Sequence, residues 1–212
     1  MRDRNAPLTE ADVPSLDWDK AEGLMPAIVQ DDATGQVLML GFMSPEALQA
    51  TLRDGRATFY SRTKARLWQK GETSGHHLEV RSVHADCDSD ALLVRADPLG
   101  PTCHLGTASC FTAEGPEGVG WLGKLARIVA GRRGADPASS YTARLLQEGP
   151  VRIAQKIGEE GVELALAAAA QDKQACVEET ADLLYHLTVL MEARSFGWDE
   201  VAATLAERHA ID

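Results

Sequence analysis

The spacing of apolar residues changes near the middle of the chain. Between residues 24 and 97, short apolar runs alternate with turn signals, a pattern typical of strands. The stretch AIVQDDATGQVLML predicts a hairpin whose turn lies near residues 33–35. The stretch SPEALQATLRDG predicts one helix, with Ser44 as its N-cap, Pro45 at its first position and Gly55 as its terminator.

Three further strands are predicted in this half, in the stretches ATFYS, HLEVRSV and ALLVRA. The order of two strands, a helix and more strands is typical of an α+β fold with a mainly antiparallel sheet. We therefore predict an α+β domain over residues 1–114. Residues 115–120, GPEGVG, are rich in Gly and Pro and are interpreted as a linker.

Helical periodicity dominates residues 121–212, which predicts an all-α second domain. Gly158 and Gly161 fall inside one of its helices and weaken that helix by about 1 kcal/mol each relative to Ala. A packed turn that requires their missing side chains is one explanation for them. The five expected helices lie in the stretches WLGKLARIVAGR, SSYTARLLQEG, PVRIAQKIGEEGVELALAAAAQ, KQACVEETADLLYHLTVLMEAR and WDEVAATLAERH.

The chain has 212 residues and a formal net charge of −11. This charge argues against a nucleic-acid backbone as the main partner, because phosphate contacts need clustered Lys and Arg. Small phosphorylated substrates remain compatible with it, since they need only a few local cations or a metal. The longest apolar stretch, LALAAAA at 164–170, is too short for a membrane helix, and the N-terminus lacks a signal-peptide core. We therefore expect a cytoplasmic protein whose thiols stay reduced.

The stretch DCDSD places three carboxylates at every second position. Such crowding costs repulsion unless the carboxylates share a cation. If the stretch is extended, Asp86, Asp88 and Asp90 share one face, and Cys87 points to the other. Three carboxylates suit Mg²⁺, whereas a thiolate suits a softer metal, above all Zn²⁺. Two metals of different character are therefore expected near one segment.

Two more thiols follow in the stretch CHLGTASC. Together with Cys87, Cys103 and Cys110 would provide three thiolates and leave a fourth zinc position for water, as in catalytic zinc sites. His104 follows one of these ligands directly and is a candidate general base or substrate contact, the alternative being a structural hydrogen-bonding residue. The bland alternative for the whole set is a solvated acidic turn with three unrelated thiols.

A basic stretch, SRTKARLWQKGETSGHH, stands out in an otherwise acidic chain. Its small residues, among them Ser74, could expose N–H groups to a phosphate. The alternative is an ordinary basic loop with Trp68 packed inward. The candidate phosphate-binding cations are Arg62, Lys64, Arg66 and Lys70.

These motifs together resemble one enzyme family. The stretches GQVLMLGFMSPEAL, SRTKARLWQKGETSGH, DCDSDALL and CHLGTASCF, within residues 20–112, are similar to phosphoribosyl-AMP cyclohydrolases of histidine biosynthesis. The resemblance implies zinc-dependent opening of the adenine ring at N1–C6. It also implies a homodimer in which two chains share each zinc. The implied ligands are Asp86, Asp88 and Asp90 for magnesium, and Cys87, Cys103 and Cys110 for zinc.

The helical half carries two pairs of acidic residues. Glu160 and Glu163 are spaced i, i+3 on one helix, and Glu179 and Asp182 have the same spacing on the next. If the two helices pack antiparallel, four carboxylates can converge on one groove and bind Mg²⁺ together with a polyphosphate. The alternative is a pair of solvated acidic faces.

The stretches KIGEEGVELALAA and EETADLLYHL resemble phosphoribosyl-ATP pyrophosphohydrolases, which are all-α nucleotide pyrophosphohydrolases. This resemblance covers residues 121–210 and implies magnesium bound by the acidic pairs. Lys124, Arg152 and Lys156 are then candidate phosphate contacts, and Glu163 is the candidate base.

The two resemblances imply consecutive steps, and so a bifunctional hydrolase. The second half would release pyrophosphate from phosphoribosyl-ATP, and the first half would then open the ring of phosphoribosyl-AMP. One rival hypothesis is a housecleaning nucleoside triphosphate pyrophosphatase with an accessory zinc domain. The other is a metal-storing or metal-sensing module whose helices only dimerise, although such a module needs no basic phosphate site.

Overall fold

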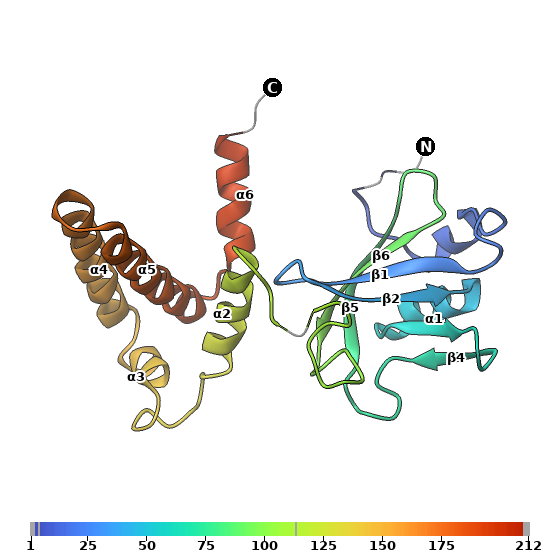
Figure 1. The fold of residues 1–212 in the computed structure, drawn as a ribbon, viewed down its shortest axis with the longest axis horizontal. Helices are drawn as coiled ribbons and strands as arrows, with labels where there is room; N and C mark the ends of the chain where they lie inside the picture. Colours follow the sequence, from blue (N-terminus) through green and yellow to red (C-terminus); the bar gives the residue numbers. More distant parts are fainter. Residues whose placement is uncertain (1–2, 4, 113, 210–212) are drawn as a thin grey trace. The chain divides into compact units, whose positions relative to one another are not determined.

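The computed structural model describes residues 3, 5–112 and 114–209 of the chain. These residues form two compact units, the first ending at Trp121 and the second beginning at Leu122 (Figure 1). The predicted linker, residues 115–120, therefore lies at the end of the first unit, and its last residue already begins a helix. No helix within the described residues is long and apolar enough to cross a membrane.

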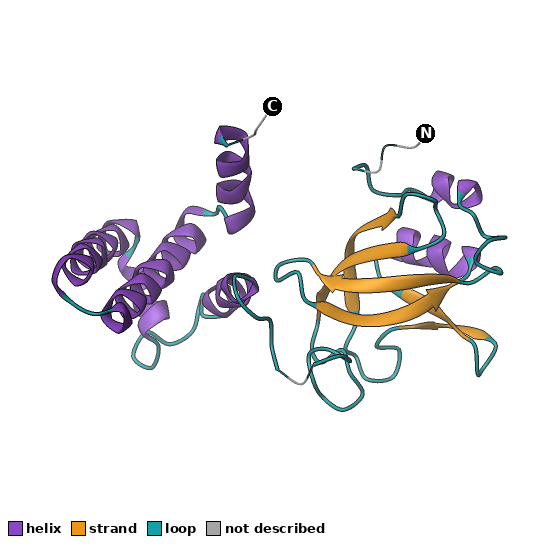
Figure 2. Cartoon of the chain, turned by 45° about the horizontal axis from the view of Figure 1, so that its top comes forward, coloured by secondary structure: helices purple, strands orange, loops and turns teal. Residues whose placement is uncertain are grey.

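The first unit is built on a four-stranded sheet, drawn in orange in Figure 2. Its strand order is β2-β1-β6-β5, and only the β1–β6 pair is parallel. The mainly antiparallel sheet and its first hairpin are thus confirmed. The strands are β1 (Met25–Asp31), β2 (Val37–Met43), β5 (Leu78–Ala85) and β6 (Leu92–Pro98).

A second, two-stranded sheet has one strand inside the basic stretch, and sequence reasoning missed that strand. β3 (Thr58–Ser61) pairs antiparallel with β4 (Arg66–Gln69), so residues 62–65 form the turn of a hairpin. Phe59 lies opposite Trp68 in this pairing, with ring centroids 5.4 Å apart. The aromatic cross-strand pair explains why a segment rich in charge still forms a strand.

One face of the main sheet is covered and the other is open. Helix α1 (Pro45–Asp54) and the 3₁₀ helix η1 (Glu10–Ser15) pack together and contribute to the core. The predicted ends of α1 are confirmed, since the Ser44 hydroxyl accepts from the Ala47 N–H at 3.3 Å and Gly55 has a φ of 66°. The fully buried core side chains include Met25, Val29, Leu48, Phe59 and Leu92.

The open face carries an apolar row that crosses three strands. Ile28 of β1 is paired with Leu40 of β2 and with Leu93 of β6, so the three side chains share one face. Ile28 and Leu40 are 40% and 45% exposed in the single chain. Adjacent exposed aliphatic side chains of this kind are typical of a surface that another protein covers.

The described residues of the second unit form five helices, and all five predicted helices are confirmed (Figure 2). α4 and α5 are joined at residues 171–172 and pack as an antiparallel pair around buried Ile153 and Val189. α4 passes through Gly158 and Gly161 without a break, and both positions face open space, so the packed-turn explanation is wrong. The bounds are α2 (Gly120–Ala130), α3 (Tyr141–Glu148), α4 (Pro150–Ala170), α5 (Lys173–Arg194) and α6 (Trp198–Arg208).

A single close approach in the first unit can be tested by substitution. A methyl group on Gly41 of β2 would lie 2.4 Å from a ring carbon of the fully buried Phe59. We expect Gly41→Ala to lower the free energy of unfolding by about 2 kcal/mol, the usual cost of overpacking a core. In the Phe59→Leu background the same change should cost much less in urea unfolding. An equal cost in both backgrounds would rule out the ring as its cause.

Candidate functional sites

The acidic stretch 86–90 forms the loop between β5 and β6 and is not extended, so the faces that an extended stretch would give its side chains do not apply. Ser89 has a φ of 63°, which turns the chain back on itself. The Asp86 carboxylate then accepts the backbone N–H groups of Asp90 at 3.1 Å and Ala91 at 3.2 Å. The curl of the loop, and not strand alternation, brings the three carboxylates together.

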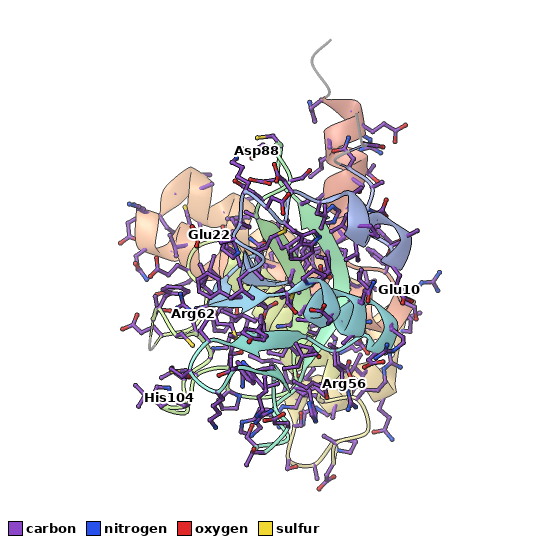
Figure 3. All side chains as sticks on the ribbon, turned by 90° about the vertical axis from the view of Figure 1, so that its right-hand side faces the viewer. Glu10, Glu22, Arg56, Arg62, Asp88 and His104 are labelled. Carbon is purple, nitrogen blue, oxygen red and sulfur yellow. The ribbon has the colours of Figure 1, made fainter. Side chains whose placement is uncertain are left out.

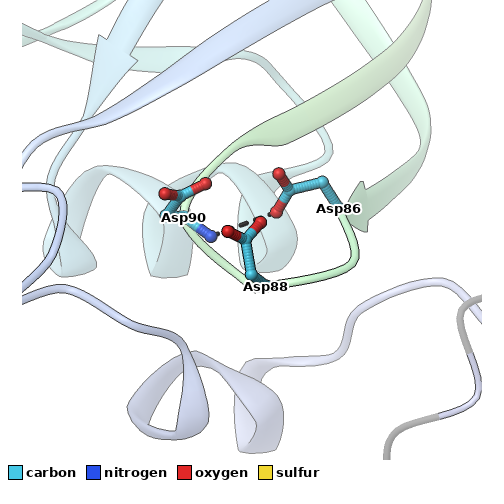
Figure 4. A group of neighbouring side chains, drawn as sticks. All are labelled: Asp86, Asp88 and Asp90. Atoms are coloured by element: carbon cyan, nitrogen blue, oxygen red, sulfur yellow. Dashed lines mark hydrogen bonds between the residues drawn. The ribbon is translucent and has the colours of Figure 1, made fainter.

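The carboxylates of Asp86, Asp88 and Asp90 each offer an oxygen within 4.8 Å of the others (Figure 4). Oxygen donors at this spacing are the ligands that a hard cation prefers. Two of the three carboxylates also face a cation from another part of the chain. Lys20 Nζ lies 2.6 Å from Asp90 Oδ2 and makes a closer contact with Asp88 Oδ2. Its hydrogen bond to Asp88 raises the pKa of Lys20 and lowers the pKa of Asp88.

Cys103 and Cys110 lie together in the segment that follows β6. The Cys110 N–H donates to the Leu38 carbonyl at 2.7 Å, which ties this segment to β2. The backbone N–H of Leu105, followed by the Thr107 hydroxyl, lowers the pKa of the Cys103 thiol. Burial raises the pKa of the Cys110 thiol. A thiol whose anion is stabilised by donors is suited to bind a metal or to act as a nucleophile.

The third predicted zinc ligand is not close to the other two within one chain. Cys87 is exposed in the acidic loop, and its Sγ lies 3.8 Å from Asp88 Oδ1. Figure 3 shows Asp88 and His104, the sequence neighbours of Cys87 and Cys103, well apart in the first unit. Among the described residues, no metal-type cluster joins the three sulfurs. A single chain therefore supplies a pair of thiols and a separate one.

A cavity of about 500 Å³ opens beside the thiol pair. Sequence reasoning singled out five of its lining residues, which come from the segments that follow β4 and β6: Lys70, Ser74, Cys103, His104 and Cys110. Burial lowers the pKa of Lys70. The buried Thr102 hydroxyl also lies at this cavity and has no hydrogen-bond partner among the residues that the structure describes. Such a group is explained when a bound molecule completes its hydrogen bonding.

The other predicted phosphate contacts of the first unit do not line this cavity. Arg62 lies over the Phe42 ring, 3.9 Å from its centroid. Arg66 pairs with Glu72, the Nη2–Oε1 distance being 2.5 Å. Lys64 is exposed in the β3–β4 turn. The structure thus brings Lys70 and Ser74 to the thiol pair, and it places these three cations on the hairpin surface.

The second unit gathers acids where α4 and α5 pack. Glu160, Glu179 and Asp182 each offer an oxygen within 4.8 Å of the others, and Glu160 is buried. Glu163 is exposed and lies outside this close group, yet its charge acts on Glu179. Burial, followed by the charges of the other acids, raises the pKa of Glu179. The carboxylates are therefore crowded enough to favour either a shared proton or a cation.

The predicted phosphate contacts of the second unit divide into two groups. Lys156 Nζ lies 2.6 Å from Glu159 Oε2 and 3.5 Å from Glu160 Oε1, beside the acidic cluster. Arg152 Nη1 lies 4.0 Å from Glu159 Oε1 on the same helix. Lys124 lies on α2, and not on either acidic helix.

Sequence reasoning missed His186, which is buried beside the acids. Its Nδ1 lies 2.9 Å from the Asp182 carbonyl oxygen and 3.6 Å from Glu160 Oε1. Because a carbonyl only accepts, Nδ1 carries the proton, and Nε2 accepts from the Tyr141 hydroxyl at 3.2 Å. The sequence feature that could have identified His186 is its position one helical turn after Asp182, on the same face of α5.

Comparison with known proteins divides the chain in the same way. The family model for phosphoribosyl-AMP cyclohydrolase matches residues 39–112, and the model for phosphoribosyl-ATP pyrophosphohydrolase matches residues 122–209. The histidine biosynthesis bifunctional protein HisIE of Vibrio cholerae is 53% identical over 196 residues, which cover 92% of this chain and 93% of that protein. The HisIE protein of Escherichia coli K12 is 53% identical over 202 residues, covering 95% of this chain and 99% of that protein.

Proposed function

Because the chain belongs to the bifunctional histidine-biosynthesis family that joins a phosphoribosyl-AMP cyclohydrolase to a phosphoribosyl-ATP pyrophosphohydrolase, we propose that each unit catalyses one reaction. The second unit hydrolyses phosphoribosyl-ATP to phosphoribosyl-AMP and pyrophosphate. The first unit opens the adenine ring of phosphoribosyl-AMP at N1–C6. The observation that carries this assignment is that each family match falls within one compact unit with its own cluster of metal-type side chains. The housecleaning alternative has no such support.

Both units present carboxylates that fit magnesium. In the first unit these are Asp86, Asp88 and Asp90, and in the second they are Glu160, Glu179 and Asp182 with Glu163 at the edge. Crowded acids and the raised pKa of Glu179 support a cation at the second cluster. When bound, magnesium would neutralise phosphate charge at these positions.

The thiol pair of the first unit fits zinc, with Cys87 of a second copy as the third ligand. The separation of Cys87 from Cys103 and Cys110 in one chain supports a site shared by a homodimer. The apolar row Leu40–Ile28–Leu93, whose first two members are exposed, supports it too, because a second copy would remove that row from water. Zinc would activate the attacking water when bound. Cysteines that serve as metal ligands must stay reduced, which supports a cytoplasmic location for this enzyme.

The residues around the thiol cavity have separate tasks in ring opening. Lys70 and Ser74 bind the substrate phosphate, and the unpaired Thr102 hydroxyl forms a hydrogen bond to the bound nucleotide. Water adds to C6 of the adenine, the N1–C6 bond breaks and N1 takes up a proton. His104 lies at the same cavity and moves that proton.

In the second unit, Lys156 and Arg152 bind the polyphosphate beside the acidic cluster. Water attacks the α-phosphorus, the bond to the β-phosphate oxygen breaks and pyrophosphate leaves. Glu163 is exposed at the edge of the cluster and accepts the proton of the water. His186 and Tyr141 hold the buried side of the cluster in place.

Separate sites predict separable losses of activity. Cys103→Ser should abolish ring opening and leave pyrophosphate release near wild type, and Glu179→Gln should do the reverse. Each loss should reach at least about 100-fold, because even partners of metal ligands are worth 10–100-fold. Pyrophosphate and the ring-opened product are measured separately with phosphoribosyl-ATP and phosphoribosyl-AMP as substrates. Each variant is the control for the other, and a loss of both activities in either one would contradict separate sites.

A shared zinc site predicts complementation between two inactive variants. Mixing Cys87→Ser chains with Cys103→Ser chains leaves one intact site in each mixed dimer. After random exchange of subunits, ring opening should therefore return to about a quarter of the wild-type rate. The matched control mixes Cys103→Ser with Cys110→Ser, whose lost thiols belong to the same chain, and it should stay inactive. Recovery in neither mixture would contradict a site built from two chains.

The contacts of His186 beside the acidic cluster of the second unit predict weaker metal binding there when His186 is replaced. His186→Phe keeps a ring but loses the contact with the Glu160 carboxylate and the hydrogen bonds to the Asp182 carbonyl and the Tyr141 hydroxyl. We expect the Mn²⁺ concentration that half-activates pyrophosphate release to rise about 10–100-fold, as for other outer partners of metal ligands. Tyr141→Phe, which loses a single hydroxyl, should have a smaller effect. An unchanged Mn²⁺ requirement in the folded His186→Phe protein would refute this role.

A further inference from the structure

The segment just before β1 is fastened to the acidic loop at two levels. The Asp17 backbone N–H donates to the Ser89 carbonyl at 2.9 Å, and the Lys20 N–H donates to Asp17 Oδ1 at 3.1 Å. From this anchored turn, the Lys20 ammonium reaches both Asp88 and Asp90. These contacts fix the main chain from which the Lys20 side chain extends.

The ammonium contacts two of the three carboxylates that the magnesium proposal needs. It contacts Oδ2 of both Asp88 and Asp90, and these two residues share a 4.8 Å cluster with Asp86. A lysine and a divalent ion at these oxygens would lie within a few ångströms of each other and would repel. Binding of either cation therefore opposes binding of the other at the cluster.

We propose that Lys20 is an internal counter-cation that neutralises the acidic loop when magnesium is absent and is displaced when magnesium binds. This inference rests on the magnesium site proposed for Asp86, Asp88 and Asp90. The Lys20 side chain is 49% exposed, so its flexible stem can carry the ammonium into water without disturbing the core. Lys20 thereby keeps the loop folded without metal and sets the metal affinity of the first unit.

Two other roles for Lys20 predict different effects of its removal on the metal affinity of the loop. An ordinary surface ion pair would leave the metal affinity of the loop unchanged when it is removed. If Lys20 instead aligned the carboxylates for the metal, its removal would weaken metal binding. A competing cation has the opposite effect, because its removal leaves the carboxylates unopposed and metal binding becomes tighter.

The test is a Mn²⁺ titration of the full-length chain, followed by electron paramagnetic resonance. The parent protein carries Glu179→Gln and Asp182→Asn, which remove two carboxylates of the second acidic cluster. Mn²⁺ binding by this parent is then expected at the first unit alone. We expect Lys20→Gln to bind Mn²⁺ about tenfold more tightly than this parent, since one unit charge leaves the cluster. Lys20→Arg keeps the charge and should match the parent. Lys64→Gln, which removes an exposed cation from the β3–β4 turn, should change the affinity less than about twofold.

Hydrogen exchange of residues 86–91 gives a second, independent readout on the same proteins. Without metal, exchange in this loop should be faster in Lys20→Gln than in the parent, and added Mn²⁺ should remove the difference. Equal or weaker Mn²⁺ binding by Lys20→Gln would overturn the proposal for Lys20. Failure of the parent to bind Mn²⁺ in a manner sensitive to Asp88→Asn would instead overturn the magnesium site itself, and the proposal for Lys20 with it.

Discussion

Repulsion between carboxylates held at close range is the constraint on which both units depend. The β5–β6 loop and the α4–α5 pair each gather three acids within 4.8 Å of one another. Neither arrangement is stable without positive charge or a proton, because like charges at this distance oppose folding. The first unit offsets the repulsion with the Lys20 ammonium, and the second has Lys156 beside Glu160. In the first unit, the proposed magnesium would take the place of that ammonium.

The two units bring their carboxylates together with different backbone structures. In the first, a left-handed residue at Ser89 curls a short loop around its own N–H groups. In the second, helical spacing of i, i+3 places the acids on facing sides of an antiparallel pair, and His186 fixes the buried side. The proposed exchange of cations takes place at an exposed loop, whereas the helical cluster includes the buried residues Glu160 and His186.

Sequence patterns predicted those features that depend on near neighbours. The caps of α1, the first hairpin and all five later helices follow from local spacing, and so does the convergence of Glu160 with Glu179 and Asp182. β4 was missed because its strand character comes from the Phe59–Trp68 pair across the hairpin. The curl at Ser89 was missed because alternating carboxylates are equally compatible with a strand. Lys20 was missed because it lies 68 residues from Asp88 along the chain.

Anomalous diffraction from crystals grown with Mn²⁺ tests the need for a shared cation most directly. We expect one peak among the oxygens of Asp86, Asp88 and Asp90, with the Lys20 ammonium turned away, and one among those of Glu160, Glu179 and Asp182. Manganese suits this purpose because it accepts the same oxygen ligands as magnesium. Crystals in which both carboxylate clusters lack a peak at saturating Mn²⁺, with Lys20 still on Asp88 and Asp90, would contradict it.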